Sequence, residues 1–143
     1  MDRNSPAENI VSASLQLAAQ KENLPQLVEF VENQARACDC PAAALMKLQI
    51  AVDDVANNIC SYSGSGYLRL VFESWASPRK IRLVFFDGGV PFDPLRKSLP
   101  DVTLSAEARP IGGLGVFLVR KLMDAVSYER RGAENVLTLE LGF

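Results

Sequence analysis

Two segments with alternating apolar residues, joined by a proline turn, most constrain the fold of this chain. Residues 67–76 and 80–86 both have the pattern of a β-strand, and they are separated only by the turn near Ser77-Pro78. So short a connection joins antiparallel neighbours, since a parallel crossover needs a dozen or more residues. The sequence therefore predicts a hairpin within a mostly antiparallel sheet.

The rest of the chain predicts helices and further strands around this hairpin. The expected elements are a strand at 10–19, a helix with apolar positions from Leu24 to Ala35, a helix at 42–60, the hairpin, a helix at 114–124, and strands near 125–131 and 135–141. This order predicts an α+β two-layer sandwich with the helices on one face of the sheet. Because the chain has no repeat and no linker, we expect a single domain over 1–143, with 1–9 disordered.

The composition excludes several kinds of chemistry. The absence of histidine excludes Ser–His and Cys–His nucleophile pairs, histidine zinc sites and a phosphohistidine carrier. With 15 basic and 17 acidic residues, the chain lacks the positive charge expected of a nucleic-acid-binding protein. There is no apolar run of about 20 residues, and residues 1–9 lack the apolar stretch of a signal peptide. The odd count of three cysteines is a poor disulfide framework. We therefore expect a soluble cytoplasmic protein.

The helix expected at 42–60 carries two carboxylate–amide pairs, Asp53 with Asn57 and Asp54 with Asn58. The apolar stripe that must face the sheet consists of Leu45, Leu48, Val52, Val55 and Ile59. At about 100° per residue, the Asp54/Asn58 pair lies about 110° from the centre of this stripe and the Asp53/Asn57 pair about 150°. The first pair is the better site candidate because it lies at the edge of the core, although a solvated helix flank is the alternative.

The chemistry of this pair suits phosphate substrates. An amide oxygen such as that of Asn58 is a neutral, hard ligand for Mg²⁺ that is held mainly by phosphates. A carboxylate one turn earlier, such as that of Asp54, could orient or deprotonate a nucleophile.

The second segment of interest, Asp87-Gly88-Gly89-Val90-Pro91, ends the second strand of the hairpin. Glycines allow a close approach between backbone and ligand. The carboxylate of Asp87 could accept a hydrogen bond from an exocyclic amine, the donor that distinguishes adenine from guanine. An ordinary turn at the end of a strand is the alternative.

The third segment, Ile111 to Phe117, begins a helix with three glycines. Free backbone amides at a helix N-terminus can bind phosphate. The segment is not a Walker A loop, because no Gly-Lys-Ser/Thr follows, and no parallel βαβ unit surrounds it as in a Rossmann fold. By itself it is a weak signal.

Together and in this order, the three segments resemble the boxes of the GHKL, or Bergerat, ATP-binding fold that gyrase, MutL and histidine kinases share. Asp54-x-x-x-Asn58 resembles the N box of that fold, which normally reads Glu-x-x-x-Asn. Asp87-x-Gly89-x-Pro91 resembles its first glycine box. The resemblance implies a histidine-kinase-like ATPase domain over essentially the whole chain.

The chain is more closely similar to the small anti-sigma-factor serine/threonine kinases of the bacterial partner-switching family. Gly113-x-Gly115 resembles the second glycine box of the GHKL fold. Phrases like DGGVPFDPL at 87–95, GGLGVFLVRKLMDAVSYERR at 112–131 and NVLTLEL at 135–141 recur in that family. The resemblance implies ATP and Mg²⁺ as cofactors.

The resemblance also implies roles for individual residues. Asn58 would coordinate the Mg²⁺ that bridges the ATP phosphates. Asp87 would bind the adenine amine, with Gly89, Pro91 and Asn135 near the base. Residues 95–111 would form the ATP lid. The residues that would bring backbone amides to the phosphates are Gly112, Gly113, Leu114 and Gly115.

The implied activity is phosphorylation of a small anti-sigma-factor antagonist, with Asp54 as general base toward a serine or threonine hydroxyl. The unphosphorylated antagonist frees a sigma factor in such systems, and phosphorylation ends that release. Asp54 is shorter by one methylene than the usual glutamate, and a base must come within about 3 Å of its proton. The alternative is therefore a nucleotide-gated binding module that sequesters a regulator with little or no kinase activity.

The expected partners are the antagonist and a sigma factor or other regulator, with no direct nucleic acid and no membrane. Members of the family commonly dimerise through the sheet, so a homodimer is a further expectation. Leu68, Leu70 and Phe72 of the first hairpin strand could serve such an interface or the core.

Overall fold

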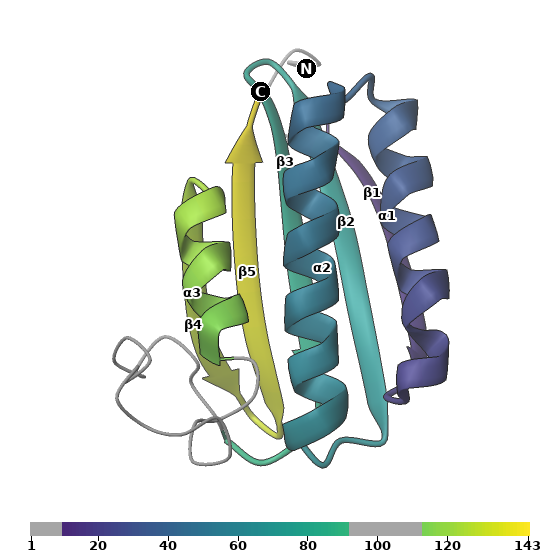
Figure 1. Cartoon of the computed structure of the whole chain (residues 1–143), viewed down its shortest axis with the longest axis vertical. Helices are drawn as coiled ribbons and strands as arrows, with labels where there is room; N and C mark the ends of the chain where they lie inside the picture. The colour runs from purple at the N-terminus through teal and green to yellow at the C-terminus, as the bar shows by residue number, and fades with distance from the viewer. Residues whose placement is uncertain (1–9, 92–112) are drawn as a thin grey trace, which may run out of the picture.

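The computed structural model describes residues 10–91 and 113–143 of the chain. In these ranges five strands form one sheet in the order β1-β2-β3-β5-β4, and every neighbouring pair is antiparallel. The helices lie on one face of this sheet (Figure 1). The α+β two-layer sandwich that the sequence predicts is confirmed, whereas the expected disorder at 1–9 falls outside the described residues.

The strands match the expected ones to within two residues at either end. They are β1 at Val11–Ala18, β2 at Tyr67–Ala76, β3 at Arg79–Asp87, β4 at Ala125–Arg131 and β5 at Glu134–Gly142. The hairpin of β2 and β3 pairs continuously from Ala76 opposite Arg79 to Leu68 opposite Asp87. Alternate residues of β2 face the helices, and Leu68, Leu70 and Phe72 are almost fully buried there. These three apolar residues therefore belong to the core.

The helices are α1 at Leu24–Ala37, preceded by a 3₁₀ turn at Lys21–Asn23, α2 at Ala42–Tyr62 and α3 at Gly113–Leu122. Across the sheet α2 lies between α1 and α3 (Figure 1). The buried stripe of α2 is wider than expected, and its members are Ala44, Leu48, Ala51, Val52, Val55 and Ala56. Leu45 and Ile59 are only half-buried. The additional buried positions are alanines because α2 has a neighbouring helix on both flanks.

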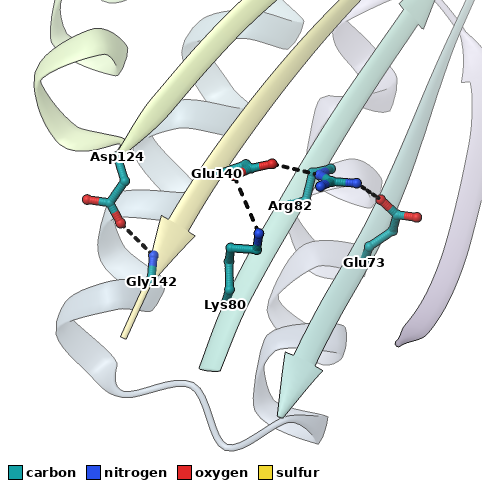
Figure 2. Close-up of polar contacts among 6 residues, drawn as sticks. All are labelled: Glu73, Lys80, Arg82, Asp124, Glu140 and Gly142. Atoms are coloured by element: carbon teal, nitrogen blue, oxygen red, sulfur yellow. Dashed lines mark hydrogen bonds and ion pairs between the residues drawn. The ribbon is translucent and has the colours of Figure 1, made fainter. Parts of the chain in front are cut away.

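The opposite face of the sheet carries a cross-strand ladder of charges near the hairpin turn (Figure 2). The guanidinium of Arg82 lies 3.3 Å from Glu73 of β2 and 2.9 Å from Glu140 of β5. Lys80 lies 3.6 Å from the same Glu140. Both cations also lie over the ring of Trp75, at 4.6 Å for Lys80 and 4.7 Å for Arg82. Opposite charges on neighbouring strands favour this register.

Elements that carry the three segments meet at one end of the sandwich, the lower end in Figure 1. There α2 and β3 end, and α3 and β5 begin. Within the described ranges, no helix is both long and apolar enough to cross a membrane.

Candidate functional site

Asp87, the last residue of β3, is a buried carboxylate with an exposed fraction of 4%. Its Oδ1 accepts a hydrogen bond from the backbone N–H of Gly89 at 2.9 Å and from Nδ2 of Asn135 at 3.1 Å. No described residue donates a hydrogen bond to Oδ2. One oxygen of Asp87 is thus held by the protein, and the other is left for a donor such as an exocyclic amine. Its role as the adenine acceptor stays a prediction.

Asn135 lies directly opposite Asp87 in the register of β3 and β5 and is 5% exposed. Its Nδ2 also donates to the carbonyl of Val90 at 2.8 Å. Its Oδ1 accepts from the hydroxyl of Tyr128 and from Nη1 of Arg130, the latter at 3.2 Å. Asn135 is therefore the centre of a polar network at the end of the sheet.

Tyr128 and Arg130 also belong to this network and were not predicted from the sequence. They alternate along β4, and Arg130 pairs in register with Asn135. The alternation of β4 is visible in the sequence, but the contact also requires the register between β4 and β5. Arg130 additionally donates from Nη1 to the carbonyl of Gly89 at 2.8 Å. This arginine thus joins β4 to the glycine segment after β3.

The turn between α2 and β2 holds the glycine segment from the other side. The backbone N–H of Val90 donates to the carbonyl of Ser63 at 3.0 Å. The N–H of Gly88 donates to Oγ of Ser65 at 2.9 Å. Polar turns of this kind give no signal in the sequence for such long-range bonds.

The turn between α2 and β2 leaves no room for a side chain at Gly89. A Cβ built on Gly89 would lie 2.1 Å from the carbonyl oxygen of Ser63, a distance no side chain can adopt. The close approach predicted for this glycine is therefore an approach between two parts of the protein itself. Pro91, the last described residue of the segment, is exposed.

The Asp54/Asn58 pair lies on the flank of α2 that faces away from α1. The opposite flank is marked by Gln49, whose Nε2 donates to Oε2 of Glu32 on α1 at 2.7 Å. Asn58 follows Gln49 by nine residues, which is about 180° around the helix, and Asp54 lies about 140° from Gln49. Both residues consequently face the side of α2 on which α3 lies (Figure 1).

The burial of these residues follows the predicted helical angles in part. Asp54 and Asn58 are half-buried and Asp53 is exposed, as expected, but Asn57 is half-buried too. Partial burial raises the pKa of the Asp54 carboxyl, and the neighbouring charge of Asp53 raises that pKa further. Within the described part of the chain, the side chains of Asp54 and Asn58 form no hydrogen bond. Asp54 is thus a carboxyl with a raised pKa and no partner among the described residues, and its catalytic role stays a prediction.

The donors at this end fit a metal that is held mainly by phosphates. Among the residues that the structure describes, no group of three or more cysteine, aspartate or glutamate side chains could hold a metal ion. Mg²⁺ is typically bound through one or two protein oxygens together with substrate phosphates and water. The amide oxygen of Asn58 is a suitable protein ligand for such an ion.

The predicted phosphate-binding residues are described only in part. Gly113, Leu114 and Gly115 form the first turn of α3, at the same end of the sandwich as Asp87. Gly112 and the expected lid at 95–111 lie outside the described residues.

Comparison with known proteins identifies the group of proteins to which this arrangement belongs. The family model of the histidine kinase-like ATPase domain matches residues 17–141. The chain belongs to this family. The match includes α2, the end of β3, the start of α3 and all of β4, so it covers each described candidate residue. A histidine kinase-like ATPase domain implies nucleotide binding, which agrees with the three segments identified in the sequence.

One relative of this ATPase domain is named as a protein kinase. The chain is 27% identical over 128 residues to the serine/threonine-protein kinase BtrW of Bordetella bronchiseptica. The alignment covers 88% of this chain and 90% of the relative. The likeness thus extends over nearly the full length of both proteins and supports a kinase-like function.

Proposed function

We propose that this ATPase domain is an ATP-dependent protein serine/threonine kinase of the anti-sigma type. It would phosphorylate a small anti-sigma-factor antagonist in the cytoplasm and thereby regulate a sigma factor by partner switching. The observation that carries the proposal is the half-buried carboxyl of Asp54, which has no partner in the described part of the chain and lies one turn before Asn58. The absence of histidine also supports it, because the chain then has no histidine to act as phosphoacceptor.

Each part of the site has a task in this proposal. Oδ2 of Asp87 accepts a hydrogen bond from the adenine amine, with Gly89, Pro91 and Asn135 near the base. The backbone amides of 112–115 hold phosphate oxygens at the start of α3. Asn58 would provide an oxygen ligand to Mg²⁺, which would supply positive charge to neutralise the phosphates.

In the transfer step, Asp54 takes the proton of the substrate hydroxyl. The hydroxyl oxygen forms a bond to the γ-phosphorus while the bond from that phosphorus to the β,γ-bridging oxygen breaks, so that ADP leaves. Positioning and charge stabilisation contribute most to such a reaction. The raised pKa of Asp54 makes its carboxylate a stronger base. This favours catalysis, because general bases act best when their pKa is near the working pH.

The second candidate function is a nucleotide-gated binding module that sequesters a regulator and transfers phosphate slowly or not at all. The observation that favours it is the identity of residue 54. An aspartate reaches less far from α2 than the usual glutamate, and proton abstraction requires an approach to about 3 Å. On this alternative, nucleotide binding would remain while label transfer would be absent.

Transfer of the γ-phosphate from labelled ATP to the antagonist, in the presence of Mg²⁺, tests the two functions. We expect transfer by the wild-type protein and a loss of at least about 100-fold in Asp54→Asn, because general-base catalysis contributes about 10²–10⁴-fold. Asp53→Asn is the matched control, since it changes the neighbouring, exposed carboxylate. Tight ATP binding without transfer by the wild type would favour the binding module. Faster transfer by Asp54→Glu would show that the short side chain limits the rate.

Calorimetric titration of ATP with and without Mg²⁺ tests the nucleotide site itself. Asn58→Ala should lose most of the Mg²⁺-dependent part of the affinity, and Asn57→Ala, one residue away, should retain it. Equal Mg²⁺ dependence in the wild type and in Asn58→Ala would remove Asn58 as the metal ligand. Failure of the wild type to bind any adenine nucleotide would refute the proposal as a whole.

A further inference from the structure

The side-chain amide of Asn135 can have only one orientation in this network. An amide presents an oxygen on one side and an NH₂ group on the other, and its neighbours decide which faces which. The guanidinium of Arg130 has donors only, and its Nη1 lies 3.2 Å from Oδ1 of Asn135. The hydroxyl of Tyr128 donates to the same oxygen. These two residues of β4 therefore turn Nδ2 of Asn135 toward Asp87.

This orientation determines how Asp87 is presented. In the observed arrangement, Nδ2 of Asn135 donates to Oδ1 of Asp87 at 3.1 Å and to the carbonyl of Val90 at 2.8 Å. With the amide reversed, its oxygen would face a carboxylate and a carbonyl, which are acceptors only. Buried acceptors facing one another are costly, because neither is satisfied. The observed orientation keeps Oδ1 occupied and leaves Oδ2 as the oxygen for a ligand.

Arg130 also fixes the backbone beside Asp87. The nitrogen that faces Asn135 also donates to the carbonyl of Gly89 at 2.8 Å. The N–H of Gly89 in turn donates to Oδ1 of Asp87 at 2.9 Å. A single guanidinium thus supports both groups that hold Oδ1 of Asp87, the Asn135 amide and the Gly89 backbone.

We propose that Tyr128 and Arg130 are positioning residues that determine the base specificity of the nucleotide site. They act through Asn135 and Gly89, which aim Oδ2 of Asp87 at the exocyclic amine of adenine. This inference rests on the proposed function, because it concerns the nucleotide of that site. It predicts that loss of the network weakens the discrimination between a base that carries an amine and a base that carries a carbonyl at the same position.

The chain offers a matched control on the same strand. Arg131 follows Arg130 directly and points to the opposite side of β4, because side chains alternate along a strand. Its guanidinium pairs with Glu129 at 3.0 Å, and both side chains are mostly exposed. Arg131→Met therefore removes the same charge and a similar length of side chain without removing the network.

The test compares ATP with inosine triphosphate, which has a ring carbonyl where adenine has the amine, by calorimetric titration. We expect the preference of the wild type for ATP to fall about 10-fold in Arg130→Met, which corresponds to about 1.4 kcal/mol. Tyr128→Phe should lower it about 3-fold, since it removes one of the two described donors to Oδ1 of Asn135. Arg130→Lys, which keeps a donor, should retain part of the preference, and Arg131→Met should retain all of it.

A second measurement needs no nucleotide. The Asn135 side-chain NH₂ should give slowly exchanging proton signals in the wild type and in Arg131→Met, and these signals should exchange faster in Arg130→Met. An unchanged ATP preference in Arg130→Met would overturn the inference, as would equal losses of affinity for both nucleotides together with a lower melting temperature. If the wild type binds neither nucleotide, the proposed function fails, and the amide signals still report on whether Arg130 orients Asn135.

Discussion

At the end of the sheet where β3 finishes, polar side chains are buried and bond to backbone groups, whereas at the hairpin end they are half-exposed and pair with one another. Asp87 and Asn135 represent the first end, and the ladder around Arg82 represents the second (Figure 2). A buried polar group that loses its partner costs about 1–3 kcal/mol, whereas an exposed ion pair contributes about 0–1 kcal/mol. The two ends should therefore respond very differently to substitution.

The largest effect is expected for Gly89→Ala at the buried end. The new Cβ would lie 2.1 Å from the Ser63 carbonyl oxygen, and this carbonyl also accepts the bond from Val90, so the turn cannot move away freely. We expect a loss of about 3 kcal/mol in the free energy of unfolding, at the upper end of the range for overpacking. Denaturant unfolding measures it. Gly66→Ala is the control, since no atom lies within 4 Å of its Cβ, and similar losses in both variants would contradict the prediction.

The contrast between the ends also separates what the sequence could predict from what it could not. Periodicity within short segments predicted the hairpin and α2, and the spacing of Asp54 and Asn58 predicted their shared flank. The partners of Asp87 are a different case. Asn135 is 48 residues away along the chain, and Arg130 is 41 residues from Gly89. Such contacts depend on the register of the whole sheet, which local patterns do not specify.

Gly89 could be identified from the sequence, but the neighbour that requires a glycine at this position could not. A glycine after a strand indicates either a ligand or a neighbouring backbone, and both readings fit the sequence equally well. The neighbour is Ser63, at the C-terminus of α2, and its position results from the packing of α2 on the sheet.

At the hairpin end, Arg82→Met should have a much smaller effect than Gly89→Ala. Arg82 bridges Glu73 and Glu140 and lies over Trp75, so several weak contacts are lost at once. We expect a loss of about 1 kcal/mol in the free energy of unfolding. Repeating the unfolding in 1 M salt should reduce the difference between variant and wild type, because salt screens exposed charges. A loss as large as that of Gly89→Ala would show that this ladder is not a surface feature.

Introducing a glycine at Asp39, near the hairpin end, should stabilise the protein, whereas removing Gly89 at the other end should destabilise it. Asp39 follows α1 with a φ of 59°, and the N–H of Cys40 donates to the carbonyl of Ala35 at 3.0 Å, as in a Schellman motif. Left-handed backbone is unfavourable for residues with a Cβ. Asp39→Gly should therefore stabilise the protein by about 0.5–1 kcal/mol, after the greater flexibility of glycine in the unfolded chain is deducted.

Thermal unfolding of Asp39→Gly and Asp39→Ala measures this effect. Alanine lacks both the freedom of glycine and the local hydrogen bonding by which aspartate tolerates this conformation, so Asp39→Ala should be less stable than the wild type. Equal melting temperatures for the glycine and alanine variants would contradict the explanation.

The smallest effect on stability is expected at Asp54, which is half-buried and has no partner in the described part of the chain. Its pKa in the folded state is raised above the unfolded value of about 3.9. As the pH rises through the interval between these two pKa values, the unfolded state loses its proton first, so the folded state binds more protons and stability falls. The stability lost in this interval stays lost at neutral pH.

Asp54→Asn should remove this pH dependence and be slightly more stable than the wild type at pH 7, by less than about 0.5 kcal/mol because solvent screens a half-exposed group. The difference should vanish below the unfolded pKa. Asp53→Asn removes only the smaller cause of the shift, the neighbouring charge, and leaves the burial of Asp54 in place. Asp53→Asn should therefore give a smaller gain in stability at pH 7 than Asp54→Asn. An equal or larger gain would mean that repulsion between the two carboxylates, rather than burial, raises the pKa of Asp54.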